Sequence, residues 1–167
     1  MRLKSEIVII LDNIRSVYNV GSIFRTAECA GVREIYLCGK TPAPVDRFGR
    51  WRNDFKKVSL GAENNVKWHL KERIKDAIEE LRQKNFFIVA VEQSKFAKNY
   101  QDISLPLKTA FVFGHEVSGV SKKALRLSDE IVEIPMRGNK ESLNVSVSVG
   151  IILFCCGFHK ISKSSSQ

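Results

Sequence analysis

Three polar segments of this 167-residue chain carry side chains that could do chemistry, and each follows an apolar run. The first holds Asn19 and Arg25, the second is Gly114-His115-Glu116, and the third is Ser142-Leu143-Asn144. A guanidinium group binds a phosphate through parallel N–H groups. Amide, hydroxyl and carboxylate groups can orient reacting atoms or accept hydrogen bonds. Such a set suits the binding and positioning of a phosphate-bearing substrate.

The third segment has two interpretations. Pro135 ends an apolar run, Gly138 lies in the polar loop that follows, and Ser142 opens a second apolar run. Unpaired backbone N–H groups at such a helix start can hold a polar or anionic ligand. The alternative is a plain N-cap, in which Ser142 or Asn144 satisfies the helix backbone.

The elements that position these segments follow from hydrophobic periodicity. Apolar runs that favour strands buried on both faces cover residues 7–11, 34–38, 86–92, 109–113 and 130–134. Helices are predicted over the second half of 14–31 with Asn19 as N-cap, over 70–84, over 121–127, and from 142 to 158. Strands that alternate with helices predict an α/β fold, a three-layer α/β/α arrangement with a mostly parallel sheet. We expect one domain over residues 1–160 and a disordered Ser/Lys-rich tail over 161–167.

The composition favours certain classes of binding partner. The net charge of +9 and a pI near 9.5 favour a polyanion, with nucleic acid ahead of an anionic membrane surface. A generally basic surface is the alternative. The four cysteines form no Cys-x-x-Cys pair, so we expect reduced thiols in a cytoplasmic protein and no metal site. The sequence has no signal-peptide layout and no apolar run long enough to span a membrane.

The stretch from residue 39 to 65 shows no clean periodicity and mixes cations with aromatic residues. The cations are Arg47, Arg50, Arg52, Lys56 and Lys57, and the aromatic residues are Phe48, Trp51 and Phe55. This mixture suits RNA binding through phosphate contacts and base stacking. Equally, the aromatic side chains could dock onto the core or onto a second subunit, and the two uses are compatible for different residues.

The dinucleotide fingerprint Gly-x-Gly-x-x-Gly and the Walker loop are both absent, which argues against dinucleotide enzymes and NTPases. Instead, the motifs Asn19–Ala27, Phe111–Gly119 and Ile134–Gly150 resemble those of the SpoU (TrmH-like) branch of the SPOUT RNA methyltransferases. Lys57–Glu63 is similar to a fourth family segment, Ser-x-Gly-Ala-Glu. The resemblance covers nearly the whole chain.

This resemblance implies a deep trefoil knot at the C-terminal end, a homodimer whose sites are completed at the subunit interface, and S-adenosylmethionine as methyl donor. Donor-binding residues are implied at Val91, Glu92, Gly114, Ile134, Met136, Ser142 and Leu143. Apolar walls and backbone groups would enclose the adenine, and no metal is required.

The implied reaction transfers a methyl group to a ribose 2′-hydroxyl of RNA. The catalytic residues implied are Arg25, Asn19, Glu116, Ser142 and Asn144. Arg25 either clamps a substrate phosphate or accepts the hydroxyl proton, and a guanidinium suits the clamp better because it stays protonated. Glu116 would orient Arg25 or balance the charge of the donor.

The substrate is expected to be tRNA ahead of rRNA. Two other functions stay open: a catalytically silent, knotted RNA-binding or assembly module, and a SPOUT methyltransferase that acts on a base.

Overall fold

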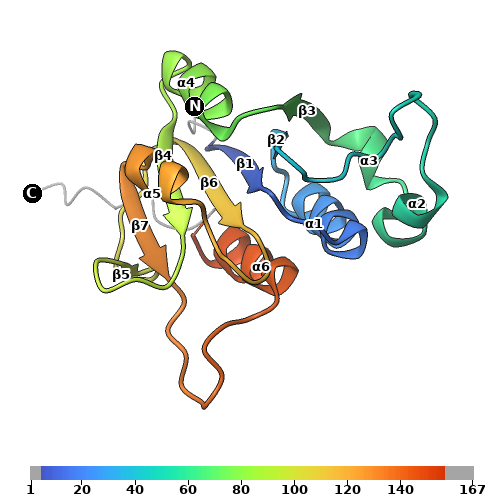
Figure 1. Ribbon diagram of the computed structural model, residues 1–167. Helices are drawn as coiled ribbons and strands as arrows, with labels where there is room; N and C mark the ends of the chain where they lie inside the picture. Colours follow the sequence, from blue (N-terminus) through green and yellow to red (C-terminus); the bar gives the residue numbers. More distant parts are fainter. Residues whose placement is uncertain (1–4, 157–167) are drawn as a thin grey trace, which may run out of the picture.

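A computed structural model describes residues 5–156 of the chain, and within this range a seven-stranded parallel sheet forms the centre of the molecule (Figure 1). The strand order is β3-β2-β1-β6-β4-β7-β5. The strands are β1 (Glu6–Asp12), β2 (Glu34–Cys38), β3 (Lys67–Lys71), β4 (Phe87–Val91), β5 (Lys98–Asn99), β6 (Lys108–Gly114) and β7 (Glu130–Glu133). All five predicted strands are present, which confirms the α/β fold with a parallel sheet.

Helices cover both faces of this sheet. They are α1 (Val17–Cys29), α2 (Asn53–Ser59), α3 (Ala62–Asn65), α4 (Ile74–Gln83), α5 (Lys122–Leu127) and α6 (Val145–Cys156). Along β1, Ile9 and Leu11 pack with α1 and α6, whereas Val8 and Ile10 pack with α4 and α5. Successive side chains of a strand point to opposite faces, so each run that is apolar throughout feeds two cores. The three-layer arrangement is therefore confirmed.

The predicted helix over residues 70–84 starts too early, because Lys67–Lys71 form the strand β3 and the helix begins at Ile74. This strand lies at the edge of the sheet beside β2, and its lysines hide its strand character from an analysis of apolar runs. The predicted apolar stripe of Ile74, Ala77, Ile78 and Leu81 is nevertheless the buried face of α4. The region 39–65 also contains two short helices, α2 and α3, that periodicity missed.

The predicted cap of α1 was wrong, whereas one of the two residues predicted to cap the last helix does so. The N-cap of α1 is Ser16, whose Oγ accepts a hydrogen bond from the backbone N–H of Asn19, so Asn19 lies within the first turn. At the start of α6, the Asn144 Oδ1 accepts the backbone N–H of Ser146 at 2.8 Å. Asn144 therefore caps this helix, and Ser142 lies in the loop before it. The predicted extension of this helix to residue 158 and the tail 161–167 lie outside the described residues.

The knot stays a prediction. A contact between distant segments is consistent with it, since the Cys156 Sγ at the end of α6 donates to the carbonyl oxygen of Tyr100 at 3.3 Å. Separately, no helix within residues 5–156 is long and apolar enough to cross a membrane.

The turn after β6 depends on the absence of a side chain at Gly114. A Cβ placed there would lie 2.2 Å from the carbonyl carbon of Gly119 and 2.2 Å from the amide nitrogen of Val120. The same turn is closed by hydrogen bonds in both directions between His115 and Gly119. The loop between β6 and α5 is thus folded back tightly on the end of its own strand.

We predict that Gly114→Ala lowers the free energy of unfolding by about 1–3 kcal/mol, because the new methyl group would overlap backbone that cannot move independently. Urea unfolding followed by circular dichroism would measure the change. Gly138→Ala is the matched control, since a Cβ at Gly138 has no neighbour within 4 Å. Equal stability of the Gly114 variant and the wild type would contradict the prediction.

Candidate active site

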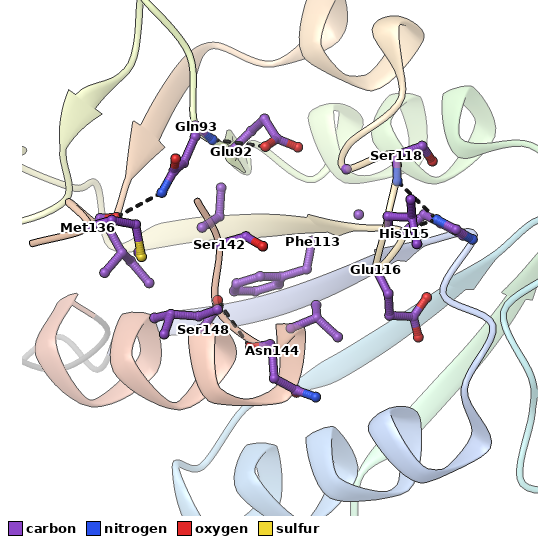
Figure 2. A pocket seen from close by; sticks show the side chains of 17 residues that line it. Glu92, Gln93, Phe113, His115, Glu116, Ser118, Met136, Ser142, Asn144 and Ser148 are labelled. Carbon is purple, nitrogen blue, oxygen red and sulfur yellow. Dashed lines mark hydrogen bonds between the residues drawn. The ribbon is translucent and has the colours of Figure 1, made fainter. Parts of the chain in front are cut away.

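A cavity of about 470 Å³ opens at the carboxyl ends of β4, β6 and β7, against the start of α6 (Figure 2). This is the edge of a parallel sheet where ligands bind in α/β folds. Its lining is Val91, Glu92, Gln93, Phe113, Gly114, His115, Glu116, Val117, Ser118, Gly119, Ile134, Met136, Ser142, Leu143, Asn144, Val145 and Ser148. All seven residues predicted from the sequence to bind the cofactor belong to it.

The cavity is lined by apolar residues and by a polar turn. Phe113 and Met136 are among the apolar residues that line it (Figure 2), and Ile134 and Leu143 also belong to the lining. The turn from Gly114 to Gly119 provides another side, with the side chains of His115, Glu116 and Ser118 (Figure 2). An apolar ring system with a polar edge would suit such a site.

The Glu92 carboxylate links two parts of the cavity wall through hydrogen bonds. Its Oε2 accepts the backbone N–H of Val120 at 2.7 Å, and its Oε1 accepts the N–H of Gln93 at 2.9 Å. The side chain thereby links the end of β4 to the loop between β6 and α5. The Gln93 Nε2 in turn donates to the carbonyl oxygen of Ile134 at 3.5 Å, beside the third motif.

Three residues from three motifs form a continuous chain of hydrogen bonds. The Asn19 Nδ2 donates to the Glu116 Oε1 at 3.0 Å, and the Asn144 Nδ2 donates to the Asn19 Oδ1 at 3.2 Å. Figure 2 shows Glu116 and Asn144 pointing from the cavity wall toward α1. These contacts fix both amide orientations, because each amide oxygen and nitrogen has a partner of the required type.

The Glu116 carboxylate also binds the start of α1. It accepts the backbone N–H groups of Arg15 and Ser16, each at 3.1 Å. Partial burial by itself raises the pKa of Glu116, but the hydrogen bonds from Asn19 and from the backbone lower it further than burial raises it. The side chain is therefore a carboxylate at neutral pH, and its oxygens are occupied in positioning α1.

His115 is committed in a similar way. Its Nδ1 lies 3.1 Å from the backbone nitrogen of Val117 and 3.2 Å from that of Ser118, so it accepts from both N–H groups. An Nδ1 that accepts cannot carry the proton, which places the hydrogen of the neutral ring on Nε2. His115 thus shapes the loop.

Arg25 does not line this cavity. Arg25 lies six positions after Asn19 on α1. At 100° per residue, the two side chains therefore point about 120° apart around the helix. Arg25 instead lines a second hollow of about 550 Å³ between α1, α2 and α6, together with Tyr18, Leu60 and Phe154. Within the described part of the chain its exposed guanidinium has no ion-pair or hydrogen-bond partner.

Ser142, which was predicted as a catalytic and donor-binding residue, lines the cavity and is exposed. Gln93 and Ser148 line the cavity but were not predicted as site residues. Ser148 belongs to the third motif, whereas Gln93 lies outside all the motifs, and no local pattern in the sequence marks it.

Different residues of the basic and aromatic stretch fit different interpretations: some are exposed, as RNA binding requires, and one is docked onto the core. Phe55 is fully buried and meets Phe24 edge-on, with ring centroids 5.2 Å apart, whereas Phe48 and Trp51 are exposed. Of the five cations, Arg50 and Arg52 form ion pairs with Asp46 and Asp54 respectively. Arg47, Lys56 and Lys57 have exposed side chains without such a pair among the described residues.

The Ser-x-Gly-Ala-Glu segment is structural in this chain. Glu63 is buried, and its carboxylate accepts a hydrogen bond from the Ser59 hydroxyl. Leu60 and Gly61, both with positive φ, turn the chain from α2 into α3. The segment fixes the position of the basic stretch relative to α1.

No group of three or more His, Cys, Asp or Glu side chains within residues 5–156 is placed to hold a metal ion.

We predict that Glu116→Gln lowers the free energy of unfolding by about 1 kcal/mol at pH 7, because an amide cannot accept at both oxygen positions. The folded pKa of Glu116 is lowered, so the wild-type advantage is complete above the unfolded pKa of about 4.3. It is then lost as the pH falls through the folded value.

Urea unfolding of both proteins at pH 7 and at about pH 3 would test this prediction. Glu28→Gln is the control, because it changes an exposed carboxylate on α1, the helix whose start Glu116 contacts. A stability difference that is the same at both pH values would argue against the assigned role.

Comparison with known proteins agrees with this geometry. The model of the SpoU rRNA Methylase family matches residues 6–154. A tRNA (guanosine(18)-2′-O)-methyltransferase of Thermus thermophilus is 29% identical over 153 residues, which is 92% of this chain and 75% of that protein. The 23S rRNA (guanosine-2′-O-)-methyltransferase RlmB of Salmonella typhi is 32% identical over 88% of this chain and 58% of its own length.

A solved structure shows the same fold. The AdoMet-bound rRNA methyltransferase of Sinorhizobium meliloti superposes with a TM-score of 0.81 at 25% identity, over 92% of this chain and 57% of that one. This chain thus spans a little over half the length of two of these three proteins. The family match covers nearly every described residue, and the chain belongs to the SpoU family, a branch of the SPOUT methyltransferases.

Proposed function

We propose that this protein is an S-adenosylmethionine-dependent RNA methyltransferase that modifies a ribose 2′-hydroxyl. The observation that carries the proposal is the joining of three motif segments around one cavity by the Glu116–Asn19–Asn144 hydrogen bonds. The matched relatives from Thermus and Salmonella are named as guanosine 2′-O-methyltransferases of tRNA and rRNA, which supports the same reaction class.

The cavity fits the proposed donor. Its volume of about 470 Å³ is in the range of sites that hold a ligand of this size. Ile134, Met136 and Leu143 would pack on the adenine, and backbone groups of the turn at Gly114 would bind its polar edge. When bound, the donor supplies a methyl group on a positively charged sulfur.

The protein's own residues would orient the RNA. Asn19 and Asn144 hold the first turns of α1 and α6 in fixed positions beside the cavity. Ser142 is exposed at the cavity, so its hydroxyl would hydrogen-bond either to the donor or to the substrate ribose. Arg25 would clamp a phosphate of the substrate and so hold the ribose hydroxyl in line with the methyl group of the donor.

A homodimer would bring these parts together. Arg25 lies in the second hollow, and three large apolar side chains of this hollow are exposed: Tyr18 is 67%, Leu60 is 64% and Phe154 is 53% exposed. Burial of this surface against a second copy would stabilise a dimer and place Arg25 next to the partner's cavity. Each active site would then take its donor pocket from one subunit and its arginine from the other.

We propose tRNA ahead of rRNA as the substrate, since the tRNA-modifying relative aligns with this chain over the larger share of its own length. Cytoplasmic location is part of the proposal, because Cys29, Cys38 and Cys155 are free thiols.

We expect the purified protein to bind S-adenosylhomocysteine by calorimetry and to methylate RNA. Nuclease digestion and mass spectrometry of the product should find the methyl group on ribose, and mapping on total RNA should identify the substrate. Absence of binding at millimolar ligand would leave only a silent module. A methyl group on a base would assign the protein to another kind of SPOUT enzyme.

We expect Arg25→Ala to retain S-adenosylhomocysteine binding and to lose methyl transfer. Leu143→Asp should lose both, because it places a charge against the cavity. After unfolding and refolding together, equal amounts of the two variants should recover about one quarter of wild-type activity, since half of the dimers hold one intact site. Failure to recover activity, with mixed dimers present, would show that Arg25 serves its own subunit or none.

A further inference from the structure

The segment Val45–Trp51 forms a small hairpin that protrudes beside α2 and α3, at the opposite edge of the sheet from β5 (Figure 1). Val45 and Trp51 pair as an antiparallel bridge, and the Asp46 N–H donates to the Arg50 carbonyl at 2.8 Å. Gly49, at φ +76°, allows the chain to reverse. We call this segment the basic hairpin.

One carboxylate organises the tip of the basic hairpin. Asp46 accepts the backbone N–H groups of Phe48 at 2.8 Å and Arg50 at 3.0 Å, and it also accepts the Arg50 Nε at 3.0 Å. Those hydrogen bonds, the one from the Arg50 backbone first, hold the pKa of Asp46 below its usual value. The tip therefore has a defined shape at neutral pH, although it lies on the surface.

The side chains of this tip form a stack that the core does not use. Phe48 is 66% exposed. The guanidinium carbon of Arg47 lies 4.7 Å from its ring centroid, and the guanidinium carbon of Arg50 lies 5.1 Å from it. Trp51 is 45% exposed, and its ring centroid lies 5.1 Å from the ammonium nitrogen of Lys56. Such exposed cation–π pairs add little to stability, so the arrangement is better explained by a ligand than by folding.

The charge of the neighbourhood identifies that ligand. Between residues 46 and 57, five cations face two carboxylates, which leaves a net charge of +3. Both carboxylates are already paired, Asp46 with Arg50 and Asp54 with Arg52. Arg47 and Lys56 therefore remain available to phosphates next to exposed aromatic rings. A polyanion that also presents flat apolar faces is a single-stranded or looped nucleic acid.

We infer that the basic hairpin binds an unpaired stretch of the substrate RNA, with a base stacked on the Phe48–Arg47 pair and neighbouring phosphates on Arg47 and Lys56. This inference rests on the proposed function for the identity of the ligand as RNA. Of the five predicted RNA-binding cations, Arg47 and Lys56 would contact the RNA. The other three have different positions: Arg50 pairs with Asp46 within the hairpin, Arg52 pairs with Asp54 at the start of α2, and Lys57 lines the second hollow. A paired duplex hides its base faces, so it can use only the phosphate contacts.

The test compares two fluorescent RNAs in anisotropy titrations: a stem-loop with an unpaired loop, and a blunt duplex of equal length. Phe48→Ala should weaken stem-loop binding about ten-fold and leave duplex binding unchanged. Arg47→Ala should weaken both and lower the slope of log K against log salt by about one. Phe96→Ala removes another exposed aromatic ring, 85% exposed, and should change neither.

Unchanged stem-loop binding by Phe48→Ala, or an equal loss with Phe96→Ala, would overturn the inference. So would a wild-type protein that binds neither RNA, or a Phe48→Ala dimer that dissociates in sedimentation velocity, since the ring would then contact a second copy. S-adenosylhomocysteine binding, measured on the same samples, should not change. If wild-type protein binds the stem-loop through Phe48 and yet transfers no methyl group, the proposed function fails and the inference stands.

Discussion

The Glu116 carboxylate joins the loop after β6 to the first turn of α1, nearly a hundred residues earlier in the chain. Backbone N–H groups at a helix start lack partners and carry partial positive charge, so an ionised carboxylate is well suited to them. Through Asn19 the same contact reaches Asn144 and the start of α6. The relative positions of three loops at one edge of the sheet depend on this set of hydrogen bonds.

Helix α1 faces two sites at once. Its first turn contributes Asn19 to the cavity side, while Arg25 lies in the hollow shared with α2 and α6. A single subunit therefore separates this cavity from the guanidinium that the same motif carries. The apolar side chains around that guanidinium supply a physical reason for association, since a second copy would cover them.

The overall charge of +9 says less about RNA binding than the local pairing of charges does. Arg50 and Arg52 both belong to the basic stretch, yet each is held by an aspartate in the same stretch. Arg50 thereby supports the basic hairpin, and Arg52 the start of α2. Arg47 and Lys56 have no such ion pair among the described residues and lie beside exposed rings, an arrangement that suits combined contacts to phosphate and base.

The sequence by itself determined the sheet, the two-faced core and the three polar segments at the strand ends, because buried strands and amphipathic stripes leave local periodic patterns. It missed β3, whose lysines and edge position remove that pattern, and it placed the cap of α1 at Asn19 instead of Ser16. Only the tertiary structure decided that Asn19 bonds to Glu116 and that Arg25 faces another hollow. Such contacts join residues far apart in the chain, and no local pattern in a single sequence encodes them.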